Sequence, residues 1–286
     1  MYEQYWQLAA KPFEPHAESA VGRADVSGGA AGPGWYFPSE PHEGASLKLR
    51  YAVDGRRSAA ALAGPSGVGK SLLVRRVMAE LDESVAPVAH LVFPQMSVRE
   101  LLAYLADRLG APSAESPRWT VDESLRRIED HLEANRDAGR HALVIVDEAH
   151  LLEDLGTLET LRLLLNLGGE RPAMTLLLVG QMGLLSAIGR TPALEDRIAV
   201  RTLLRTFTPA ETAEYVAHRM EAGGATRRVF DPEAVERMHR IAGGSPRAIN
   251  RLADLALVVG FAEQLPTIDA AHIESVSQEL LAISPE

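Results

Sequence analysis

The sequence predicts an α/β fold: a five-stranded parallel sheet flanked by helices, followed by a small all-helical domain. Three observations lead to this prediction. Short apolar runs alternate with helical patterns from residue 36 to residue 207, as in chains that form parallel sheets. A glycine-rich loop joins the first of these runs to the helical pattern that follows it. After residue 207 the strand-like runs stop, and helix-start signals recur instead.

The strands are predicted where apolar residues follow one another for five or six positions, which is too short for a typical helix. Such runs are typical of strands that are covered on both faces of a parallel sheet. Four candidates fit this description for most of their length, at residues 59–63, 88–93, 142–146 and 175–179. Residues 200–204 are a fifth, shorter candidate, in which Arg201 and Thr202 interrupt the apolar run.

Two helices are predicted between these strands. Residues 70–81 have a helical pattern directly after the glycine-rich loop. The second helix is predicted because five apolar residues recur at helical spacing and therefore share one face. These residues are Val98, Leu101, Leu102, Leu105 and Leu109.

The all-helical part contains four predicted helices. Thr208-Pro209-Ala210-Glu211 combines a capping box with proline at the first helical position. A cap residue followed by proline recurs at 231–232 and at 245–246. A fourth helix is predicted over residues 269–281.

The N-terminal region has a different character. Residues 14–34 contain few large apolar side chains and many alanines and glycines, so we predict a flexible loop there. Before this loop, a short apolar cluster is expected to dock on the main body of the protein. Its members are Tyr5, Trp6, Leu8 and Phe13.

The composition excludes several function classes. The 286 residues include no cysteine, which rules out disulfides, thiolate zinc sites and cysteine nucleophiles. A formal net charge of -10 argues against non-specific coating of nucleic acid or anionic membranes. The N-terminus lacks the basic and apolar regions of a secretory signal, and no apolar run approaches the ~18 residues of a spanning helix. We therefore expect a cytoplasmic protein without membrane insertion.

The glycine-rich loop fits the phosphate-binding pattern G-x-x-x-x-G-K-[ST]. Its glycines allow successive backbone N–H groups to turn toward phosphate oxygens, and the following helix adds the positive end of its dipole. In this pattern Lys70 contacts the β- and γ-phosphates, and the Ser71 hydroxyl is a ligand of Mg²⁺. The loop therefore predicts binding of ATP and Mg2+ by Gly64, Pro65, Ser66, Gly67, Val68, Gly69, Lys70 and Ser71.

The apolar run at 142–146 ends in two adjacent acids, Asp147 and Glu148. Carboxylates at the end of a buried strand are unfavourable unless they meet a cation or transfer a proton. We predict that Asp147 holds Mg²⁺ through its water shell and that Glu148 polarises the attacking water. A solvated acidic strand end is the alternative interpretation.

Residues 147–150, Asp-Glu-Ala-His, also match the box of a helicase class. Such helicases need two tandem motor cores, whereas this chain has one phosphate-binding loop, so that interpretation fails. His150 is interpreted as a helix-start residue rather than a catalyst.

The order of these motifs, followed by a helical lid, resembles an AAA+ ATPase, which is a P-loop NTPase. More closely, the chain resembles the ExeA type, named after general secretion pathway protein A, and its pilus-assembly relatives. Transposon accessory ATPases share much of the pattern. The resemblance covers nearly the whole chain and rests on residues 5–13, 36–39, His42, Glu43, Ala45, 64–71, 146–150, 178–181 and 243–252.

The resemblance implies two sensor residues. Gln181 matches the sensor 1 position, where a polar side chain reads the γ-phosphate. Arg247 matches sensor 2, in the first turn of a lid helix that Ser245 and Pro246 would start. The alternatives are a turn residue for Gln181 and a surface arginine for Arg247.

The resemblance also implies an arginine finger. Arg197 matches the stretch that supplies a guanidinium to the neighbouring subunit, with Arg190 and Arg201 as nearby competitors. Such a finger would stabilise charge on the transferred phosphoryl group. Activity would then require a homo-oligomer, either a ring or a filament.

On the same resemblance we predict three regions along the chain. Residues 1–34 form the N-terminal apolar motif and flexible loop. Residues 35–207 form the AAA+ nucleotide-binding domain, and residues 208–286 form the helical lid domain.

Two functions are open at this point. The first is ATP hydrolysis that drives assembly or remodelling of a protein partner, of the secretion or pilus type, and the overall acidity favours it. The second is a regulatory ATPase acting on duplex DNA. A small-molecule kinase is disfavoured, because Glu148 and the sensor-like lid suit attack by water. A basic surface for DNA binding would come from two pairs of adjacent arginines, Arg126 with Arg127 and Arg227 with Arg228. Such pairs usually mark a solvated helix face.

Overall fold

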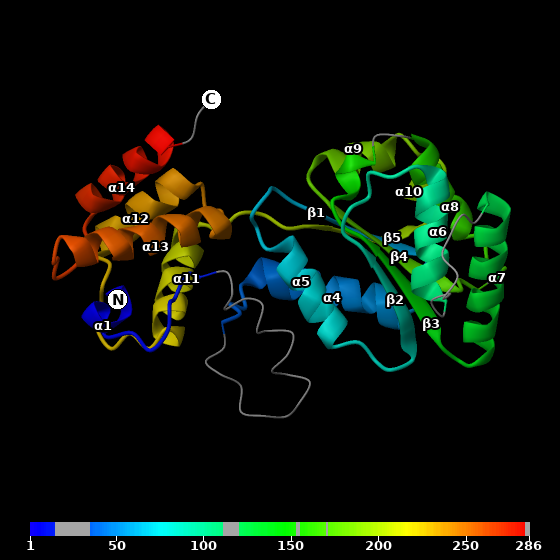
Figure 1. Ribbon diagram of the computed structural model, residues 1–286, viewed down its shortest axis with the longest axis horizontal. Coiled ribbons are helices and arrows are strands. Elements are labelled where there is room, and N and C mark those ends of the chain that lie inside the picture. The colour runs from blue at the N-terminus through cyan, green and yellow to red at the C-terminus, as the bar shows by residue number, and fades with distance from the viewer. Residues whose placement is uncertain (15–34, 111–119, 153–154, 170, 284–286) are drawn as a thin grey trace. The chain divides into compact units, whose positions relative to one another are not determined.

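The computed structural model describes residues 1–14, 35–110, 120–152, 155–169 and 171–283. Except for Glu14, the loop predicted at 14–34 lies outside the described residues. The chain divides into two compact units (Figure 1). The helical unit comprises Met1–Glu40, Ser66–Ala79 and Arg205–Glu286, and the sheet unit comprises Pro41–Pro65 and Glu80–Leu204.

The sheet unit is built on five strands that are all parallel and lie in the order β2-β3-β4-β1-β5 (Figure 1). The predicted fold class is confirmed, and every predicted strand is present. Since β4 lies between β1 and β3, two strands that are distant in sequence end at the same edge of the sheet. The strands are β1 Ala59–Ala63, β2 Val85–Leu91, β3 His141–Val146, β4 Met174–Gly180 and β5 Ile198–Leu203.

The second strand ends earlier than the sequence predicts. Its neighbour β3 ends at Val146, which pairs with Leu91, so the ladder offers no further strand residues to Val92 and Phe93. These two apolar residues are accordingly 61% and 64% exposed. Apolar character alone therefore overestimates the length of this edge strand.

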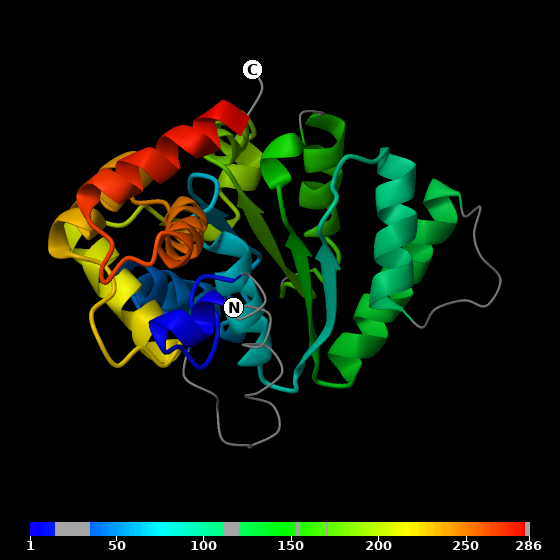
Figure 2. The ribbon, with the colours of Figure 1, turned by 60° about the vertical axis from the view of Figure 1, so that its left-hand side comes forward.

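Helices cover both faces of the sheet. In both views α4 lies on one side of the sheet, and α6 and α7 lie on the other (Figure 1 and Figure 2). Both α6 and α7 begin with capping boxes, whose first residues are Ser97 and Thr120. The helices of this unit are α4 Glu40–Asp54, α6 Val98–Leu109, α7 Val121–Asp137, α8 Leu155–Leu164, α9 Gly183–Gly189, α10 Pro192–Glu195 and the 3-10 helix η1 Ala149–Leu151.

The core of the sheet unit explains why β1, β3 and β4 are almost entirely apolar. Alternate strand residues such as Ala61 and Val144 pack with Leu105 and Ile128 in one cluster. The strand residues between them are buried as well, so β1, β3 and β4 have no solvent-facing side. Burial on both faces removes the alternation of polar and apolar residues that a one-sided sheet would show.

The helical unit contains all four of the helices that the sequence predicts after residue 207. Three of them have proline in the first turn, which suits a position whose N–H makes no helical hydrogen bond. Across the described part of the chain, no helix has both the length and the apolar character needed to cross a bilayer. The helices of this unit are α1 Tyr2–Trp6, α5 Lys70–Ala79, α11 Pro209–Ala222, α12 Pro232–Ala242, α13 Pro246–Ala262 and α14 Ala270–Ile283.

The N-terminal apolar cluster is part of the core of the helical unit. Trp6 is fully buried, and its Nε1 donates a hydrogen bond to the carbonyl oxygen of Leu257 at 2.9 Å. The Tyr2 hydroxyl donates to Asp254 at 2.7 Å, and burial together with this bond raises the pKa of Tyr2. These contacts hold α1 against α13.

Candidate functional site

The glycine-rich loop starts at Gly64, directly after β1. The backbone N–H of Gly64 donates to the carbonyl oxygen of Gly180 at 3.2 Å, which ties the loop to the end of β4. A Cβ at this position would collide with the carbonyl oxygen of Leu204. Only glycine therefore allows the two backbones to approach this closely. Pro65 follows and is exposed.

The loop continues in the helical unit with the backbone of a phosphate cradle. Gly67 and Gly69 have φ angles of 78° and 97°, in the region that favours glycine. Val68 between them is fully buried and anchors the loop, while Lys70 and Ser71 open α5. The first turn of α5 contains no acidic residue, so its positive dipole end is not neutralised there. These features fit an anionic phosphate group.

Arg247 lies against this loop within the helical unit. Its backbone N–H donates to the carbonyl oxygen of Gly67 at 3.1 Å, and its Nη1 is 3.5 Å from the Ser66 hydroxyl. A Cβ on Gly67 would lie only 2.9 Å from the Cβ of Arg247 and 2.8 Å from Oγ of Ser245. The first turn of α13 and the glycine loop therefore have a close backbone contact.

The two acids follow β3 at the same edge of the sheet as Gly64. Val146 pairs with Leu178 of β4, and Leu178 pairs with Ala61 of β1, so the three strands end nearly level. Asp147 is only 4% exposed, and its Oδ1 accepts a hydrogen bond from the backbone N–H of Glu148 at 2.8 Å. A carboxylate oxygen in this setting suits a cation ligand.

Glu148 has an unusual backbone. Its φ of 50° lies in the left-handed region, where a residue with a Cβ is strained by about 1–3 kcal/mol. Its side chain is half-buried, and among the described residues none forms a hydrogen bond with its buried Oε2. A strained residue with an unsatisfied carboxylate oxygen is typical of a functional position.

His150 lies in the 3-10 helix η1, and its contact with the end of β4 is not among the sequence predictions. Its Nδ1 accepts a hydrogen bond from the backbone N–H of Gln181 at 3.3 Å and lies 3.3 Å from Oε2 of Glu148. The imidazole is thus hydrogen-bonded to the residue after β4 and lies next to the acid after β3. The only signal in the sequence is that both strands end in polar residues, and this has meaning only once β3 and β4 are known to be neighbours.

The three candidate finger arginines differ in their contacts. Arg197 donates to the carbonyl oxygen of Leu165 at 3.2 Å and to Oδ1 of Asn166 at 2.5 Å. Arg201 forms an ion pair with Glu195 at 2.6 Å. Arg190 is exposed at the end of α9, and its side chain has no hydrogen bond or ion pair with any described residue.

The predicted site residues therefore form two groups. Gly64, Pro65, Asp147, Glu148 and Gln181 follow the carboxyl ends of strands in the sheet unit. The remainder of the loop, residues 66–71, lies with Arg247 in the helical unit. Arg197 belongs to neither group, because its guanidinium is held by the turn after α8.

Comparison with known proteins identifies the family. An AAA domain matches residues 53–188. Across its whole length the chain is 31% identical to General secretion pathway protein A of Aeromonas hydrophila. The chain is an AAA+ protein of the ExeA type. It spans 50% of the length of that relative.

Solved structures with a similar fold include two ORC structures and a RuvB structure. Drosophila ORC bound to DNA matches with a TM-score of 0.66 at 15% identity, covering 96% of this AAA+ chain and 67% of that chain. The Aeropyrum pernix ORC2 protein, in its ADPNP-ADP complexes, matches with a TM-score of 0.61 at 17% identity. The match covers 92% of this chain and 75% of that chain. The Thermotoga maritima RuvB Holliday junction branch migration motor matches with a TM-score of 0.58 at 18% identity. This match covers 87% of this chain and 72% of that chain. At these identities the likeness concerns the fold alone.

Proposed function

We propose that this AAA+ protein binds ATP with Mg2+ at the 64–71 loop and hydrolyses it. The observation that carries the proposal is the left-handed backbone of Gly67 and Gly69 directly before α5. It is supported by a strained acid, Glu148, at the end of a strand that is separated from β1 only by β4. Loop, helix start and acid are the parts that phosphoryl transfer to water requires.

Different residues would bind the phosphates and the metal ion. The backbone of residues 64–69 and the ammonium of Lys70 would hold the phosphates, while Ser71 and Asp147 would hold Mg2+. When bound, Mg2+ neutralises charge on the phosphate oxygens. Arg247, whose backbone is hydrogen-bonded to Gly67, would extend its guanidinium toward the same phosphates.

Glu148 would act as the general base. It would accept a proton from the attacking water at its carboxylate, and its Oε2 has no competing hydrogen bond among the described residues. His150 accepts a hydrogen bond from the backbone N–H of Gln181 at its Nδ1 and would thereby hold the end of β4 beside Glu148. The role of Gln181 would be to contact the γ-phosphate.

Nucleotide binding is tested with Lys70→Ala. Removing the ammonium should weaken ATP binding by about 100-fold or more, since one charge-assisted contact to phosphate is lost in a low-dielectric loop. Titration calorimetry with ATP and Mg2+ measures this effect, with Lys48→Ala on the exposed face of α4 as the control. Wild-type affinity in Lys70→Ala would show that the loop is not the phosphate site.

We further propose that the active form is a homo-oligomer in which a neighbouring subunit supplies an arginine. Arg197 is the first candidate, although its donation to Leu165 and Asn166 would have to be released. Mixing Lys70→Ala with Arg197→Ala should restore part of the activity, because one subunit keeps the loop and the other keeps the arginine. Arg190→Ala and Arg201→Ala are each mixed with Lys70→Ala in the same way. The arginine finger is the residue whose alanine variant is inactive alone and regains ATPase activity in the mixture.

For the biological role, we propose remodelling of a protein partner, of the secretion type, on the basis of the 31% identity to a secretion protein. Action on duplex DNA is the second candidate, which the resemblance of the sequence motifs to transposon accessory ATPases leaves open.

Binding of labelled duplex DNA by Glu148→Gln, held with ATP and Mg2+ at near-physiological salt, separates the two roles. No binding up to micromolar protein is expected for the protein-remodelling role. Tight, ATP-dependent binding would move the proposal to a DNA-linked ATPase.

A further inference from the structure

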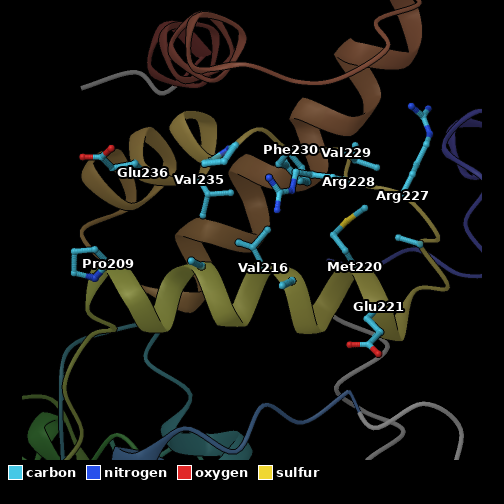
Figure 3. A pocket seen from close by; sticks show the side chains of 14 residues that line it. Pro209, Val216, Met220, Glu221, Arg227, Arg228, Val229, Phe230, Val235 and Glu236 are labelled. Atoms are coloured by element: carbon cyan, nitrogen blue, oxygen red, sulfur yellow. The ribbon is translucent and has the colours of Figure 1, made fainter.

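The helical unit contains an apolar groove between α11, α12 and the segment that joins them (Figure 3). The cavity has a volume of about 540 Å³, within the range of about 300–1,000 Å³ that is common for ligand sites. Val216, Met220 and Phe230 form part of its lining and are themselves buried. Nothing in the proposed ATP chemistry uses this groove.

The groove follows the length of α11. Its lining begins at Pro209 and reaches Glu221, a distance of about 18 Å along the helix axis. Ala213 and Ala217, one turn apart, line the groove and are exposed, so this side of α11 has no large side chain to close it. Met220 adds a flexible, polarisable wall that adapts to different apolar side chains. An elongated occupant fits these dimensions better than a compact one.

One positive charge stands over the groove. The side chain of Arg228 lies over the cavity, whereas that of Arg227 points away from it (Figure 3). Arg228 is exposed and has no hydrogen bond or ion pair with any described residue. Arg227, by contrast, donates to the carbonyl oxygen of Pro266 at 2.7 Å and its guanidinium lies over the ring of Trp6.

The acids at the rim do not balance this charge. Glu236 forms an ion pair with Arg240. The carboxylate of Glu221 points to the opposite side of α11 from Arg228 (Figure 3). Although the whole chain carries a formal net charge of -10, this groove therefore presents an uncompensated guanidinium above an apolar floor.

We propose that this groove binds an amphipathic, acidic peptide segment of a partner protein. Apolar side chains of the peptide fill the cavity along α11, and one of its carboxylates pairs with the guanidinium of Arg228. The polar side of the peptide remains in water above Ala213 and Ala217. An alkyl chain in the same place would leave its outer side exposed to water, which makes the peptide the better fit.

The test uses three fluorescein-labelled peptides of 14 residues and the full chain. The peptides share leucines at helical i, i+3, i+4 and i+7 spacing and carry glutamate, glutamine or lysine at their remaining positions. In a fluorescence anisotropy titration, the glutamate peptide should bind with a micromolar Kd, at least tenfold more tightly than the lysine peptide. The glutamine peptide should fall between them.

Two groove variants locate the binding. Arg228→Glu should weaken binding of the glutamate peptide at least tenfold and improve that of the lysine peptide. Ala217→Trp should fill the groove and weaken all three peptides. Arg171→Glu, the same change at an exposed position of the sheet unit, should alter each Kd less than twofold. ATP affinity and Tm should stay at wild-type values in every variant, which separates this result from a failure of the proposed ATP site.

Other occupants would appear as different outcomes. The proposal is wrong if the glutamate peptide binds no more tightly than the lysine peptide, or if its binding survives both Arg228→Glu and Ala217→Trp. Binding of dodecanoate without binding of any peptide would make the groove a site for an anionic alkyl chain. A dimer that Ala217→Trp dissociates, again without peptide binding, would make it an interface between two copies of this chain.

Discussion

The strand β3 has a polar residue at each end, and the two ends differ in how these residues are satisfied. At the amino end, His141 is 2% exposed and its Nε2 lies 2.9 Å from the hydroxyl of Thr175. That hydroxyl donates to the carbonyl oxygen of Arg57 at 2.6 Å, so it accepts from His141 and the chain of hydrogen bonds is closed.

At the carboxyl end the corresponding network is open. Glu148 has a left-handed backbone, and its buried Oε2 lacks a hydrogen bond from any described residue. A closed buried network stabilises the fold, whereas an open one leaves hydrogen-bonding capacity for a ligand. We infer from this difference that the amino edge of the sheet serves stability, whereas the carboxyl edge is the place where the proposed chemistry would occur.

The largest effect is expected at the carboxyl edge. Glu148→Gln should reduce ATP turnover by about 10²–10⁴-fold, because the amide cannot accept the proton from water. ATP affinity and Tm should change little, since Gln occupies the same space. A coupled assay for phosphate release and calorimetric Tm measure both, and turnover within threefold of wild type would remove Glu148 from the role of base.

The opposite pattern is expected at the amino edge. Thr175→Val should lower the free energy of unfolding by about 1–3 kcal/mol, because it leaves the buried Nε2–H of His141 and the Arg57 carbonyl oxygen without a partner. Turnover per folded molecule should not change. Denaturant unfolding measures the first quantity, and a loss of turnover without loss of stability would contradict the division between the two edges.

The amino edge should also make stability depend on pH. Burial lowers the pKa of His141 from 6.5 to about 4. Between those values the unfolded chain binds a proton that the folded chain does not, so stability decreases as the pH falls through this window. From pH 7 to pH 5 the contribution is a loss of about 2 kcal/mol. Denaturant titrations at both pH values should show a smaller loss in His141→Gln, which does not titrate.

The smallest effect concerns His150. His150→Ala should reduce turnover about tenfold, or about 1.4 kcal/mol, because the backbone N–H of Gln181 loses its acceptor and Gln181 is held less firmly beside Glu148. ATP affinity should be preserved. In His150→Asn, whose side-chain oxygen can accept from the Gln181 N–H, part of the turnover should return. If Ala and Asn variants have equal turnover, the hydrogen bond to Gln181 has no positioning role.

The strands β1, β3 and β4 could be predicted from the sequence because their burial on both faces leaves apolar runs without alternation. The end of β2 could not, since Val92 and Phe93 are as apolar as the strand, and only the end of β3 at Val146 shows that pairing stops. The helix α7 was missed, although Thr120 and Glu123 form a capping box at its start. Its apolar residues Val121, Leu125, Ile128 and Leu132 also recur at helical spacing, so the sequence contains both signals for this helix.

The candidate site shows the same contrast between local and distant signals. The loop at 64–71 and the acids Asp147 and Glu148 are contiguous in sequence, so their pattern was readable without a structure. The contact of His150 with Gln181 depends on the pairing of β3 with β4, which no local pattern encodes. The hydrogen bonds of Arg197 to the turn after α8 likewise join residues that are 31 and 32 positions apart.

The hydrogen bond from the N–H of Arg247 to the carbonyl oxygen of Gly67 belongs entirely to the main chain. Arg247→Ala would remove the guanidinium and leave this backbone bond intact. A small effect of that substitution would therefore not show that the loop and α13 are uncoupled. Only a change to the backbone amide of Arg247 tests the hydrogen bond between α13 and the loop. Replacement of that amide by an ester, introduced by chemical ligation, would separate what the side chain does for the nucleotide from what the peptide group does for the helix.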